Sequence, residues 1–436
     1  MTFDELRATA RGAVLVPGDA GFDAAAQPWN IAVAQPVAAV VEAADADDVA
    51  AVVSFAARTG IQVATQPTGH GATGGLDAAI LLRTGRLNAV EIDADRRIAT
   101  VGAGAQWGAV QAAAVAHGLT GLAGSNPVVG VTGYTVGGGF AWFGRKYGWA
   151  SDAVRAFEIV DATGARRRVD AGSDPDLFWA LRGGGGDFAV VTGLEFDLFP
   201  LARVYGGRVM WPADRTAEVF ALFQRLTAAA PDELSLWFNR VQLPGAPAMV
   251  GLDAAWVGAI EAGREMLAVL DTIDGAIADT RGELSVAEIG AITAEPTDPS
   301  PAVSRAALLT GLDAAGLESV LAEPVAPLMA IQIRHLGGAL ARTRDGGGAR
   351  GAATAPYLLY LLGLGLPHLI DSVRARQDAI LEALGSQATG GLPVTFLSGS
   401  NTVADAFDAA ALTRLRAVKK AQDPQSVLRA NFPVNR

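Results

Sequence analysis

The chain has 436 residues, half of them apolar and 18% charged, and its formal net charge is −11. This composition excludes a disordered chain, whose residues are mostly polar and charged, and the lack of a basic block argues against nucleic acid or an anionic membrane as a partner. The lack of cysteine excludes disulfides, thiolate catalysis, zinc-thiolate sites and iron–sulfur clusters.

The N-terminal segment, MTFDELRATARG, has acids and an early helical pattern where a secretory signal would have an apolar core. Farther along, Gly, Pro, Asp or Arg interrupts every alanine-rich apolar stretch before it reaches the roughly 18 residues of a membrane span. We therefore expect a cytoplasmic protein with neither a membrane nor a nucleic-acid partner. The sequence leaves the oligomeric state open, and its length predicts about two or three domains.

The sequence of residues 45–102 predicts a helix and several short strands. Apolar residues at helical spacing, with acids in the first turn, indicate a helix over residues 45–58. Residues 61–64 and 79–82 are typical of short buried strands, and residues 89–102 of a hairpin around a polar turn. The two short strands are separated by a glycine-rich turn.

Residues 106–199 continue in the same style. A helix is predicted over residues 106–117, with Gly118 as its C-cap. Residues 121–139 contain too much glycine for a regular element, and predict a long loop or a helix start where the backbone approaches something closely. The other predicted elements are strands at residues 155–161, 166–169 and 188–199 and a short helix at residues 176–182.

The composition changes after Pro200, where we place a domain boundary. Longer amphipathic helices follow, with strands between them, and the chain ends in a helix and a final turn. The predicted segments are helices at residues 215–229 and 259–273, loops at residues 293–301 and 345–351, a last helix from residue 409 and a turn at residues 431–433.

Three glycine-rich loops, at residues 68–75, 130–139 and 182–187, carry the chemical information. Without a Cβ, backbone N–H groups can converge on a phosphate. A single phosphate needs one such loop, so three indicate a long ligand such as a dinucleotide. Gly102–Gly108 resembles the Rossmann glycine pattern, but its spacing is off by one and the acid about twenty residues later is missing. A tight strand-to-helix turn explains those glycines.

Ordered motifs surround the loops. They are Gly69-His70-Gly71 with Gly74-Gly75, Asn126–Gly133, Gly137–Gly139, Tyr147–Asp152, Asp176–Gly185, Phe188–Thr192, Arg414–Lys419, Asp423-Pro424 and Asn431. Together they resemble the FAD-binding domain of the vanillyl-alcohol oxidase / p-cresol methylhydroxylase (PCMH) superfamily. Within it, the chain is similar to the berberine-bridge-enzyme-like branch, which includes bacterial hydroxynicotine and sugar oxidases. The resemblance is close over residues 45–200, loose over residues 200–400, and returns at the C-terminus.

The resemblance implies an α+β fold with three parts. Residues 1–200 would form a PCMH-type FAD-binding domain of two α/β subdomains. Residues 201–395 would form a substrate-binding domain, an antiparallel sheet backed by helices, and residues 396–436 would return to the FAD domain.

The implied activity is that of an FAD-linked oxidase. Hydride would pass from a small aromatic or secondary-metabolite substrate, an alcohol or an amine, to flavin N5, and O2 would reoxidise the flavin and give H2O2. Two alternatives stay open: a dehydrogenase of the same fold with another electron acceptor, and a flavin-containing protein that binds a small molecule and confers resistance to it.

By resemblance, His70 is bonded covalently to the 8α methyl group of the flavin's benzenoid ring. The alternative is a histidine that lines the loop beside non-covalent FAD. Many relatives form a second bond through a cysteine at the position that aligns with Asn126. This chain has no cysteine, so the expected cofactor is monocovalent, 8α-histidyl FAD.

The remaining cofactor residues are also implied by the resemblance. Val129 is a small residue that in plant relatives leaves room for oxygen above the reactive flavin carbon, which favours an oxidase; the alternative is that Val129 simply packs. The implied contacts are Pro67, Thr68, Gly69, Gly71 and Ala72 at the pyrophosphate; Gly130, Gly133, Gly137 and Gly138 past the ribityl chain and phosphates; Gly185, Gly186, Val190 and Val191 at the adenosine; and Asn126, Val129 and Asn431 at the ring. Tyr134 is a further candidate at the ring, with packing in its helix or loop as the alternative.

The candidate catalytic residues are Tyr360, Tyr357 and His335. Both tyrosines lie in an apolar run whose counterpart in the family faces the ring. On a strand they point to opposite faces, so at most one reaches the flavin, and we expect Tyr360. Ordinary core packing is the alternative for each. His335 is either a structural histidine or a base suited to neutral pH.

Two further patterns bear on the chemistry. Residues 393–396 stand where many bacterial relatives carry a Tyr-x-Asn pair, and both members are absent. This favours a substrate that needs no strong base, such as an amine or an activated phenolic compound. No metal site is expected, because the four histidines lack the spacing of a metal-binding pair; they are His70, His117, His335 and His368.

Overall fold

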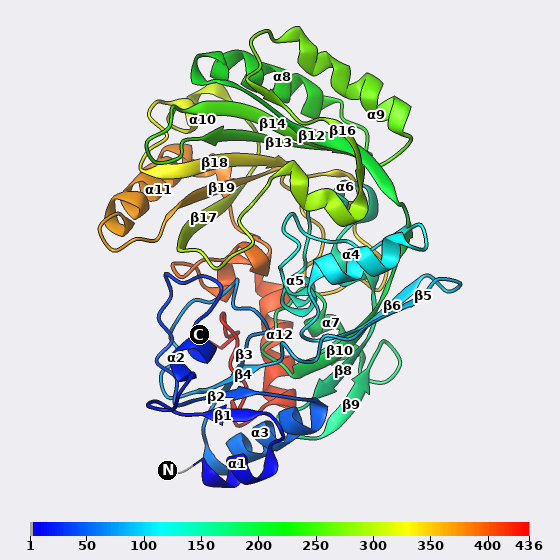
Figure 1. Cartoon of the computed structure of the whole chain (residues 1–436), viewed down its shortest axis with the longest axis vertical. Coiled ribbons are helices and arrows are strands. Elements are labelled where there is room, and N and C mark those ends of the chain that lie inside the picture. The colour runs from blue at the N-terminus through cyan, green and yellow to red at the C-terminus, as the bar shows by residue number, and fades with distance from the viewer. Residues whose placement is uncertain (1–2, 436) are drawn as a thin grey trace.

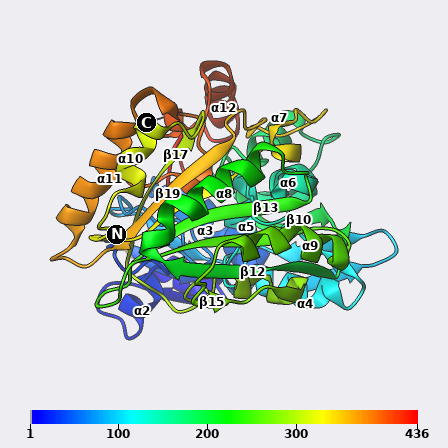
Figure 2. The same ribbon diagram turned by 90° about the horizontal axis from the view of Figure 1, so that it is seen from above.

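The computed structural model describes residues 3–435 and shows a chain arranged in two halves (Figure 1). The lower half contains a four-stranded and a five-stranded sheet, and the upper half contains one large sheet covered on its outer side by helices; residues 119–120 and 199–200 form a further two-stranded sheet. This arrangement is α+β, as the sequence predicts. Figure 2 shows the helices of the upper half lying across its strands.

The N-terminal subdomain is built on a four-stranded sheet with the order β1-β2-β4-β3. Strands β2, β4 and β3 are parallel, and β1 pairs with β2 in the antiparallel sense. Its elements are α1 (Asp4–Thr9), β1 (Ala13–Leu15), α2 (Phe22–Ala26), β2 (Ala39–Glu42), α3 (Ala46–Thr59), β3 (Val63–Thr65) and β4 (Ile80–Arg83).

Helix α3 shows why these residues fold as predicted. The Asp45 side chain caps the helix by accepting hydrogen bonds from two backbone N–H groups, and Gly60 ends it with a φ of 72°. Val49, Val52 and Ala56 repeat every three or four residues and are fully buried, which places one apolar face of the helix against the sheet.

The second subdomain has an antiparallel sheet with the order β5-β6-β10-β8-β9. Its core is continuous with the underside of the large sheet. Its elements are β5 (Val90–Asp93), β6 (Ile98–Gly102), α4 (Trp107–Val115), β7 (Leu119–Thr120), α5 (Val131–Val136), α6 (Gly144–Tyr147), β8 (Val154–Val160), β9 (Arg166–Val169), α7 (Pro175–Leu181), β10 (Val190–Asp197) and β11 (Phe199–Pro200).

The large sheet is antiparallel and runs in the order β15-β12-β14-β13-β18-β19-β17-β20, with β16 also paired to β12. Helices α8 to α11 belong to this half of the chain (Figure 1). Its elements are β12 (Arg203–Pro212), α8 (Thr216–Ala228), β13 (Leu234–Val241), β14 (Met249–Trp256), α9 (Ile260–Leu267), β15 (Ala278–Asp279), β16 (Gly282–Ser285), β17 (Ala302–Leu309), α10 (Ala314–Leu321), β18 (Leu328–His335), β19 (Tyr357–Leu364), α11 (Ile370–Leu384) and β20 (Ala388–Thr389).

The two faces of the large sheet meet different partners because side chains alternate along each strand. Phe238 and Ile333 point outward into a core shared with α8. Trp237 points inward and stacks on Trp142 of the second subdomain, with ring centroids 3.7 Å apart. We call this inward side the inner face.

The C-terminal helix α12 (Ala409–Gln422) returns to the lower half, where a buried charge cluster holds the chain end. Lys419 Nζ lies 3.3 Å from a carboxylate oxygen of Asp187 and 2.8 Å from one of Asp423, and all three side chains are almost fully buried. Asp187 also accepts hydrogen bonds from the backbone N–H groups of Ala430 and Val434. The cluster therefore fixes the final residues to the loop before β10.

Most predicted elements agree with the structure to within a few residues. Two differ in detail. The helix predicted to end at Gly118 ends at Val115 with Ala116 as its cap, and Gly118 has a φ of 72° in the turn that follows. The helix predicted over residues 259–273 is an α-helix only to Leu267, and continues as a 3₁₀ turn.

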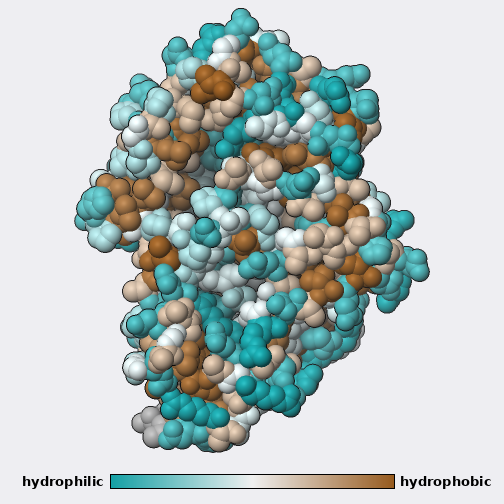
Figure 3. Space-filling model, viewed as in Figure 1, coloured by the Kyte–Doolittle hydropathy of each residue, from teal (hydrophilic) through white to brown (hydrophobic). Residues whose placement is uncertain are grey.

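The described surface offers few large apolar side chains. Of the large hydrophobic residues that the structure places, Ile31, Leu243 and Ile277 are exposed, and apolar colour is scattered over the face drawn in Figure 3. None of the helices within residues 3–435 is long and apolar enough to cross a membrane. The same residues contain no group of three or more acidic or histidine side chains that could hold a metal ion.

We predict that Lys419→Met destabilises the protein by about 3–5 kcal/mol, because it leaves two buried carboxylates without their cation. The measurement is the free energy of unfolding in urea. Lys420→Met is the matched control, since Lys420 is the next residue and is exposed. Equal stability of the two variants would show that the cluster does not hold the chain end.

Candidate functional site

The loop between β3 and β4 carries His70 and depends on a glycine. Gly69 has a φ of 81°, and a Cβ at this position would lie 2.7 Å from the Cβ of Pro28. A side chain here would strain the backbone and displace its neighbour. The backbone N–H of Trp29 donates to the carbonyl of Thr68 at 3.0 Å. The segment before β2 therefore lies directly against the His70 loop.

The His70 imidazole is held between Trp29 and Thr68. Its ring stacks on the Trp29 indole, with centroids 4.3 Å apart and planes 15° apart, and Nδ1 lies 2.8 Å from the Thr68 hydroxyl. Nε2 is buried and has no hydrogen-bond partner among the described residues. Burial lowers the pKa of His70 to about 4, so the ring is neutral at pH 7 and keeps a nitrogen lone pair.

The second loop starts helix α5 and packs on the first. A Cβ at Gly130 would lie 3.7 Å from Thr68 Cγ2. Helix α5 contains Thr132, Tyr134 and Thr135, and their hydroxyl groups are buried without a partner among the described residues. Burial raises the pKa of Tyr134, so this phenol stays protonated at neutral pH.

The third loop, residues 182–187, joins the second through its backbone. The N–H of Gly185 donates to the carbonyl of Val136, the last residue of α5, at 2.9 Å. Gly183 has a φ of 93°, and a Cβ there would lie 2.5 Å from the Cβ of Arg350. A chain segment of the upper half therefore closes over this loop.

The other loop glycines differ in the space around them. A Cβ at Gly133 or Gly186 would meet nothing within 4 Å. At Gly137, a Cβ would lie 2.8 Å from Thr395 Cγ2, and Gly138 has a φ of 106°. The second loop is thus open along one side of α5 and packed at its end.

The chain end closes over the first loop. Asn431 Nδ2 donates to the Gly71 carbonyl at 2.6 Å, and the Thr73 hydroxyl donates to the Asn431 carbonyl at 3.3 Å. A pocket of about 260 Å³ lies between residues 73–75 and the segments 399–403 and 429–433. Residues far apart in sequence thus form one wall around the His70 loop.

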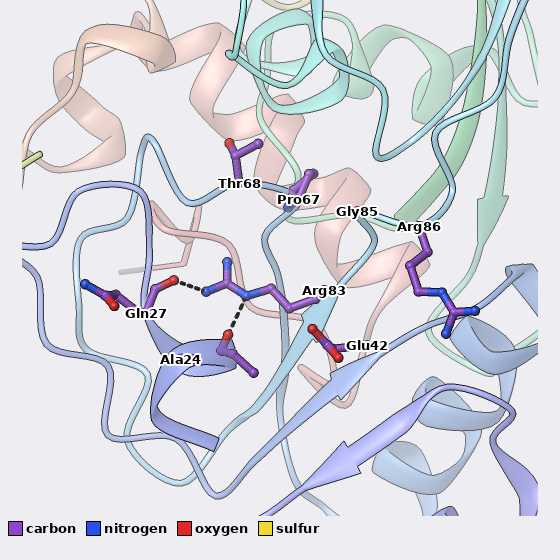
Figure 4. A pocket seen from close by; sticks show the side chains of 9 residues that line it. Ala24, Gln27, Glu42, Pro67, Thr68, Arg83, Gly85 and Arg86 are labelled. Atoms are coloured by element: carbon purple, nitrogen blue, oxygen red, sulfur yellow. Dashed lines mark hydrogen bonds between the residues drawn. The ribbon is translucent and has the colours of Figure 1, made fainter. Parts of the chain in front are cut away.

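A pocket of about 380 Å³ lies beside Pro67 and Thr68 (Figure 4). Arg83 reaches into it, with Nε donating to the Ala25 carbonyl at 2.9 Å and Nη2 to the Gln27 carbonyl at 2.8 Å. Burial lowers the pKa of Arg83 to about 10, which leaves it charged at neutral pH. Its guanidinium ties the C-terminal end of α2 to β4.

Buried polar atoms without a protein partner gather around the three loops. Each such atom costs about 1–3 kcal/mol unless a ligand or water satisfies it. The ones near the loops are His70 Nε2, Thr132 Oγ1, Tyr134 Oη, Thr135 Oγ1 and Ser151 Oγ. The pyrophosphate, hydroxyl groups and ring carbonyls of FAD supply partners of the kinds that these atoms require, so the residues fit this cofactor.

Three residues predicted at the cofactor have their side chains engaged elsewhere. Val190 and Val191 are buried in two different cores on the two faces of β10, so only their backbone can meet a ligand. Asn126 Nδ2 donates to the Pro296 carbonyl at 2.8 Å, and its Oδ1 accepts from the N–H of Val128 at 3.1 Å. The Asn126 amide therefore holds two loops together.

Two of the three candidate catalytic residues have side chains that contact groups away from the glycine loops, which is the structural alternative stated for each. Tyr357 lies on the outer face, 2.9 Å from the hydroxyl of Thr227 in α8. His335 packs on Tyr357, with ring centroids 5.6 Å apart, and its Nε2 lies 3.2 Å from Arg145 Nη1. Burial and that cation lower the pKa of His335 to about 3. Side chains alternate between the two faces along β18 and β19, and this alternation directs both residues into contacts of a structural kind.

Tyr360 lies on the inner face, opposite in direction to Tyr357. It packs edge-on against Phe396, with ring centroids 5.9 Å apart, and is hydrogen-bonded to Ser304. Burial raises the pKa of Tyr360, so its hydroxyl is protonated at neutral pH. In this state it is suited to hydrogen bonding and is a weak base.

A row of polar side chains crosses the inner face beside Tyr360. The cross-strand register brings its members from four neighbouring strands side by side. We call Arg208, Asp253, Asn239, Gln332 and Arg334 the polar row. Arg208 forms a bidentate pair with Asp253, at 2.5 and 2.8 Å, Gln332 Nε2 donates to Asn239 Oδ1 at 2.6 Å, and Arg334 Nε donates to Gln332 Oε1 at 2.5 Å.

Arg334 ends the row as a buried cation. Its residue is 7% exposed, and its guanidinium carbon lies 3.9 Å from the Trp237 ring centroid. No carboxylate of the described chain lies within 4 Å of its nitrogens. A desolvated cation–π contact contributes about 2 kcal/mol, whereas burying an unpaired ion costs several kcal/mol. The aromatic contact alone does not balance this burial.

The polar row was not anticipated from the sequence, although a signal exists. In β18, Gln332 and Arg334 alternate with the apolar Ile331 and Ile333. Polar residues at a spacing of two inside an otherwise apolar strand mark a face that meets something other than a hydrocarbon core. The same pattern places Asp253 between apolar neighbours in β14.

Comparison with known proteins agrees with this geometry. Residues 37–170 match a family model described as an FAD binding domain. (R)-6-hydroxynicotine oxidase of Paenarthrobacter nicotinovorans is 33% identical over 222 residues, which are 50% of this chain and 48% of that protein. The chain thus spans about half or less of the length of the curated relatives it matches.

Solved structures extend the likeness over the whole chain at the level of the fold. BBE-like 1 of Physcomitrella patens superposes with a TM-score of 0.87 at 20% identity, covering 100% of this chain and 99% of that one. Glucooligosaccharide oxidase from Acremonium strictum, described with 6-S-cysteinyl, 8α-N1-histidyl FAD, superposes with a TM-score of 0.84 at 20% identity, covering 100% and 99%. The expected FAD-binding domain is confirmed over residues 37–170, and the chain shares the fold of berberine-bridge-enzyme-like and sugar oxidases.

We predict that His70 stays neutral in the folded protein until the pH falls to about 4. Below pH 6.5 the unfolded chain takes up a proton that the folded chain refuses, so stability falls as the pH drops from 6.5 towards 4. In flavin-free protein, wild type should lose stability relative to His70→Gln over that interval. The matched control is His117→Gln, at an exposed histidine: this variant keeps His70 and should lose stability with falling pH as wild type does. An equal loss of stability in His70→Gln would contradict the assignment.

Proposed function

Since residues 37–170 form an FAD-binding domain and the chain has the fold of the berberine-bridge-enzyme-like oxidases, we propose that the protein is an FAD-linked oxidase of a small organic molecule. The observation that carries the proposal is His70: a neutral, half-buried imidazole whose Nε2 is buried and unpartnered among the described residues, set on a glycine loop that two other glycine loops and the chain end surround.

His70 is proposed to hold FAD through an 8α-histidyl bond. A histidine forms a carbon–nitrogen bond only through a lone pair, and burial supplies the neutral form over the whole physiological range. The stack on Trp29 and the contact with Thr68 orient the ring, which lowers the entropy lost when the bond forms. With no cysteine in the chain, the attachment is monocovalent.

The three loops share the remaining contacts in this proposal. Backbone N–H groups of residues 68–71 bind the pyrophosphate, while the Ala72 N–H donates to the Gly69 carbonyl at 3.2 Å. The open sides of Gly133 and Gly186 receive the chain of the cofactor. Tyr134 and Thr135 offer hydroxyl groups without other partners among the described residues. Asn431, near the chain end, lies at the same site, where its side chain donates a hydrogen bond to the Gly71 carbonyl.

Oxidation of an alcohol or amine removes a hydride from carbon and a proton from oxygen or nitrogen. FAD, held by His70 and the three loops, would supply the hydride acceptor, with O2 as the final oxidant reduced to H2O2. Tyr360 is proposed to orient the substrate's polar hydrogen. Its neutral hydroxyl, bonded to Ser304, is a weak base at neutral pH. This fits a substrate whose proton leaves readily, such as a neutral amine or an activated phenolic compound.

We predict that the flavin stays with the wild-type protein after acid precipitation and is released from His70→Ala, because only the covalent bond survives unfolding. The measurement is the absorption spectrum of pellet and supernatant. His117→Ala is the control. Flavin in the supernatant of wild type would remove the covalent bond but keep the FAD-binding domain; a protein that never takes up FAD would contradict the proposal itself.

We also predict that O2 reoxidises the photoreduced protein rapidly and that Val129→Leu slows this step by about tenfold, since one added methylene in a closed pocket has an effect of that size. Val129 is half-buried against the core of the second subdomain. Oxygen consumption in a stopped-flow experiment measures both rates. Slow reoxidation of wild type, together with fast reduction of a quinone, would instead indicate a dehydrogenase.

A further inference from the structure

The inner face of the large sheet carries a cation whose hydrogen-bonding capacity is largely unused. Arg334 commits Nε to Gln332 and one face of its guanidinium to Trp237. The guanidinium carbon is also 5.2 Å from the ring centroid of Phe396 and 5.5 Å from that of Tyr360. Among the described residues, no acceptor is recorded for Nη1 or Nη2. The two terminal nitrogens of the guanidinium therefore lie among aromatic rings and are free to donate hydrogen bonds.

No neighbouring carboxylate among the described residues forms an ion pair with Arg334. Asp253 is held in the bidentate pair with Arg208. Glu295 is close enough to act on Arg334 through space, but its carboxylate accepts from the Ser125 hydroxyl at 2.9 Å and forms no ion pair with the cation. Tyr360 lies beside it as a neutral phenol.

We propose that Arg334 recognises an anionic oxygen, a carboxylate or a phenolate, on an aromatic substrate of the oxidase. The proposal rests on the proposed function, because it assigns the inner face to the substrate. A planar, five-donor guanidinium binds such an oxygen with two parallel hydrogen bonds. The half-buried rings of Tyr360 and Phe396 give a planar substrate surfaces to pack on, while Trp237 is covered by Trp142 and by Arg334 itself.

The chemistry of the row favours an anion over a neutral sugar. Neutral hydroxyl groups would leave the charge of a buried guanidinium unbalanced, whereas a carboxylate or phenolate balances it. Gln332 and Asn239 are already bonded to each other, so the row offers few free amide groups of the kind that bind a run of sugar hydroxyls. The same cation repels a protonated amine.

The test uses benzoate and benzamide, which have nearly the same shape and differ in charge. Binding to the flavin-loaded protein is followed by the change in flavin absorption and, independently, by the shift in melting temperature. We expect benzoate to bind wild type about tenfold or more tightly than benzamide. A ratio of this size in the dissociation constants corresponds to one charge-assisted hydrogen bond. Arg334→Met should abolish that preference, and Arg334→Lys should keep part of it.

Arg305→Met is the matched control, because Arg305 lies in the same sheet but pairs with Asp378 of α11. Equal binding of the two probes to wild type, binding of neither, or an unchanged preference in Arg334→Met would each overturn the proposal. A changed flavin spectrum in unliganded Arg334→Met with the preference retained would also overturn it, by placing the charge on the cofactor. Flavin content, measured for every variant, separates these results from failure of the proposed function.

Discussion

The site depends on the buried cluster of Lys419, Asp187 and Asp423. Lys419 reaches both carboxylates and the carbonyls of Asp187 and Leu428, so the third glycine loop and the chain end are held by one cation. The chain end in turn holds the His70 loop through Asn431. Because a buried ion is stable only with its partners, loops from opposite ends of the sequence are fixed at one place, and a cofactor that spans them meets a preformed surface.

A second cation, Arg145, fixes the large sheet over this surface. It donates from α6 to the carbonyls of Leu234 and Ala230 in the upper half, at 2.7 and 3.1 Å, and it faces His335. His335 thus belongs to the junction of the two halves, where a neutral imidazole can sit beside a guanidinium. With Trp142 stacked on Trp237, the junction sets the distance between the inner face and the loops. The inner face and the glycine loops are therefore positioned relative to one another by this junction.

Local patterns in the sequence predicted the elements and the glycine loops, because caps, spacing and turn residues act within a few positions. They did not predict that the loops converge, since convergence depends on Lys419 reaching Asp187 across more than half of the chain. Alternation showed that Tyr357 and Tyr360 face opposite ways, and a family resemblance pointed to Tyr360. Which face of β19 meets the lower half depends on tertiary packing. It is set by Trp237 of β13 and by α8, which lie outside the sequence of β19.

The charges on the site's residues restrict the class of substrate more than the residue types alone do. Burial keeps His70 and Tyr360 neutral, so neither contributes a charge near the substrate at pH 7. Arg334 remains charged and lacks a counter-ion among the described residues. An ammonium substrate would meet that cation across a low-dielectric space, where like charges interact strongly. The missing Tyr-x-Asn pair left an amine and a phenolic compound equally open; the unpaired guanidinium favours the substrate that arrives with a negative oxygen.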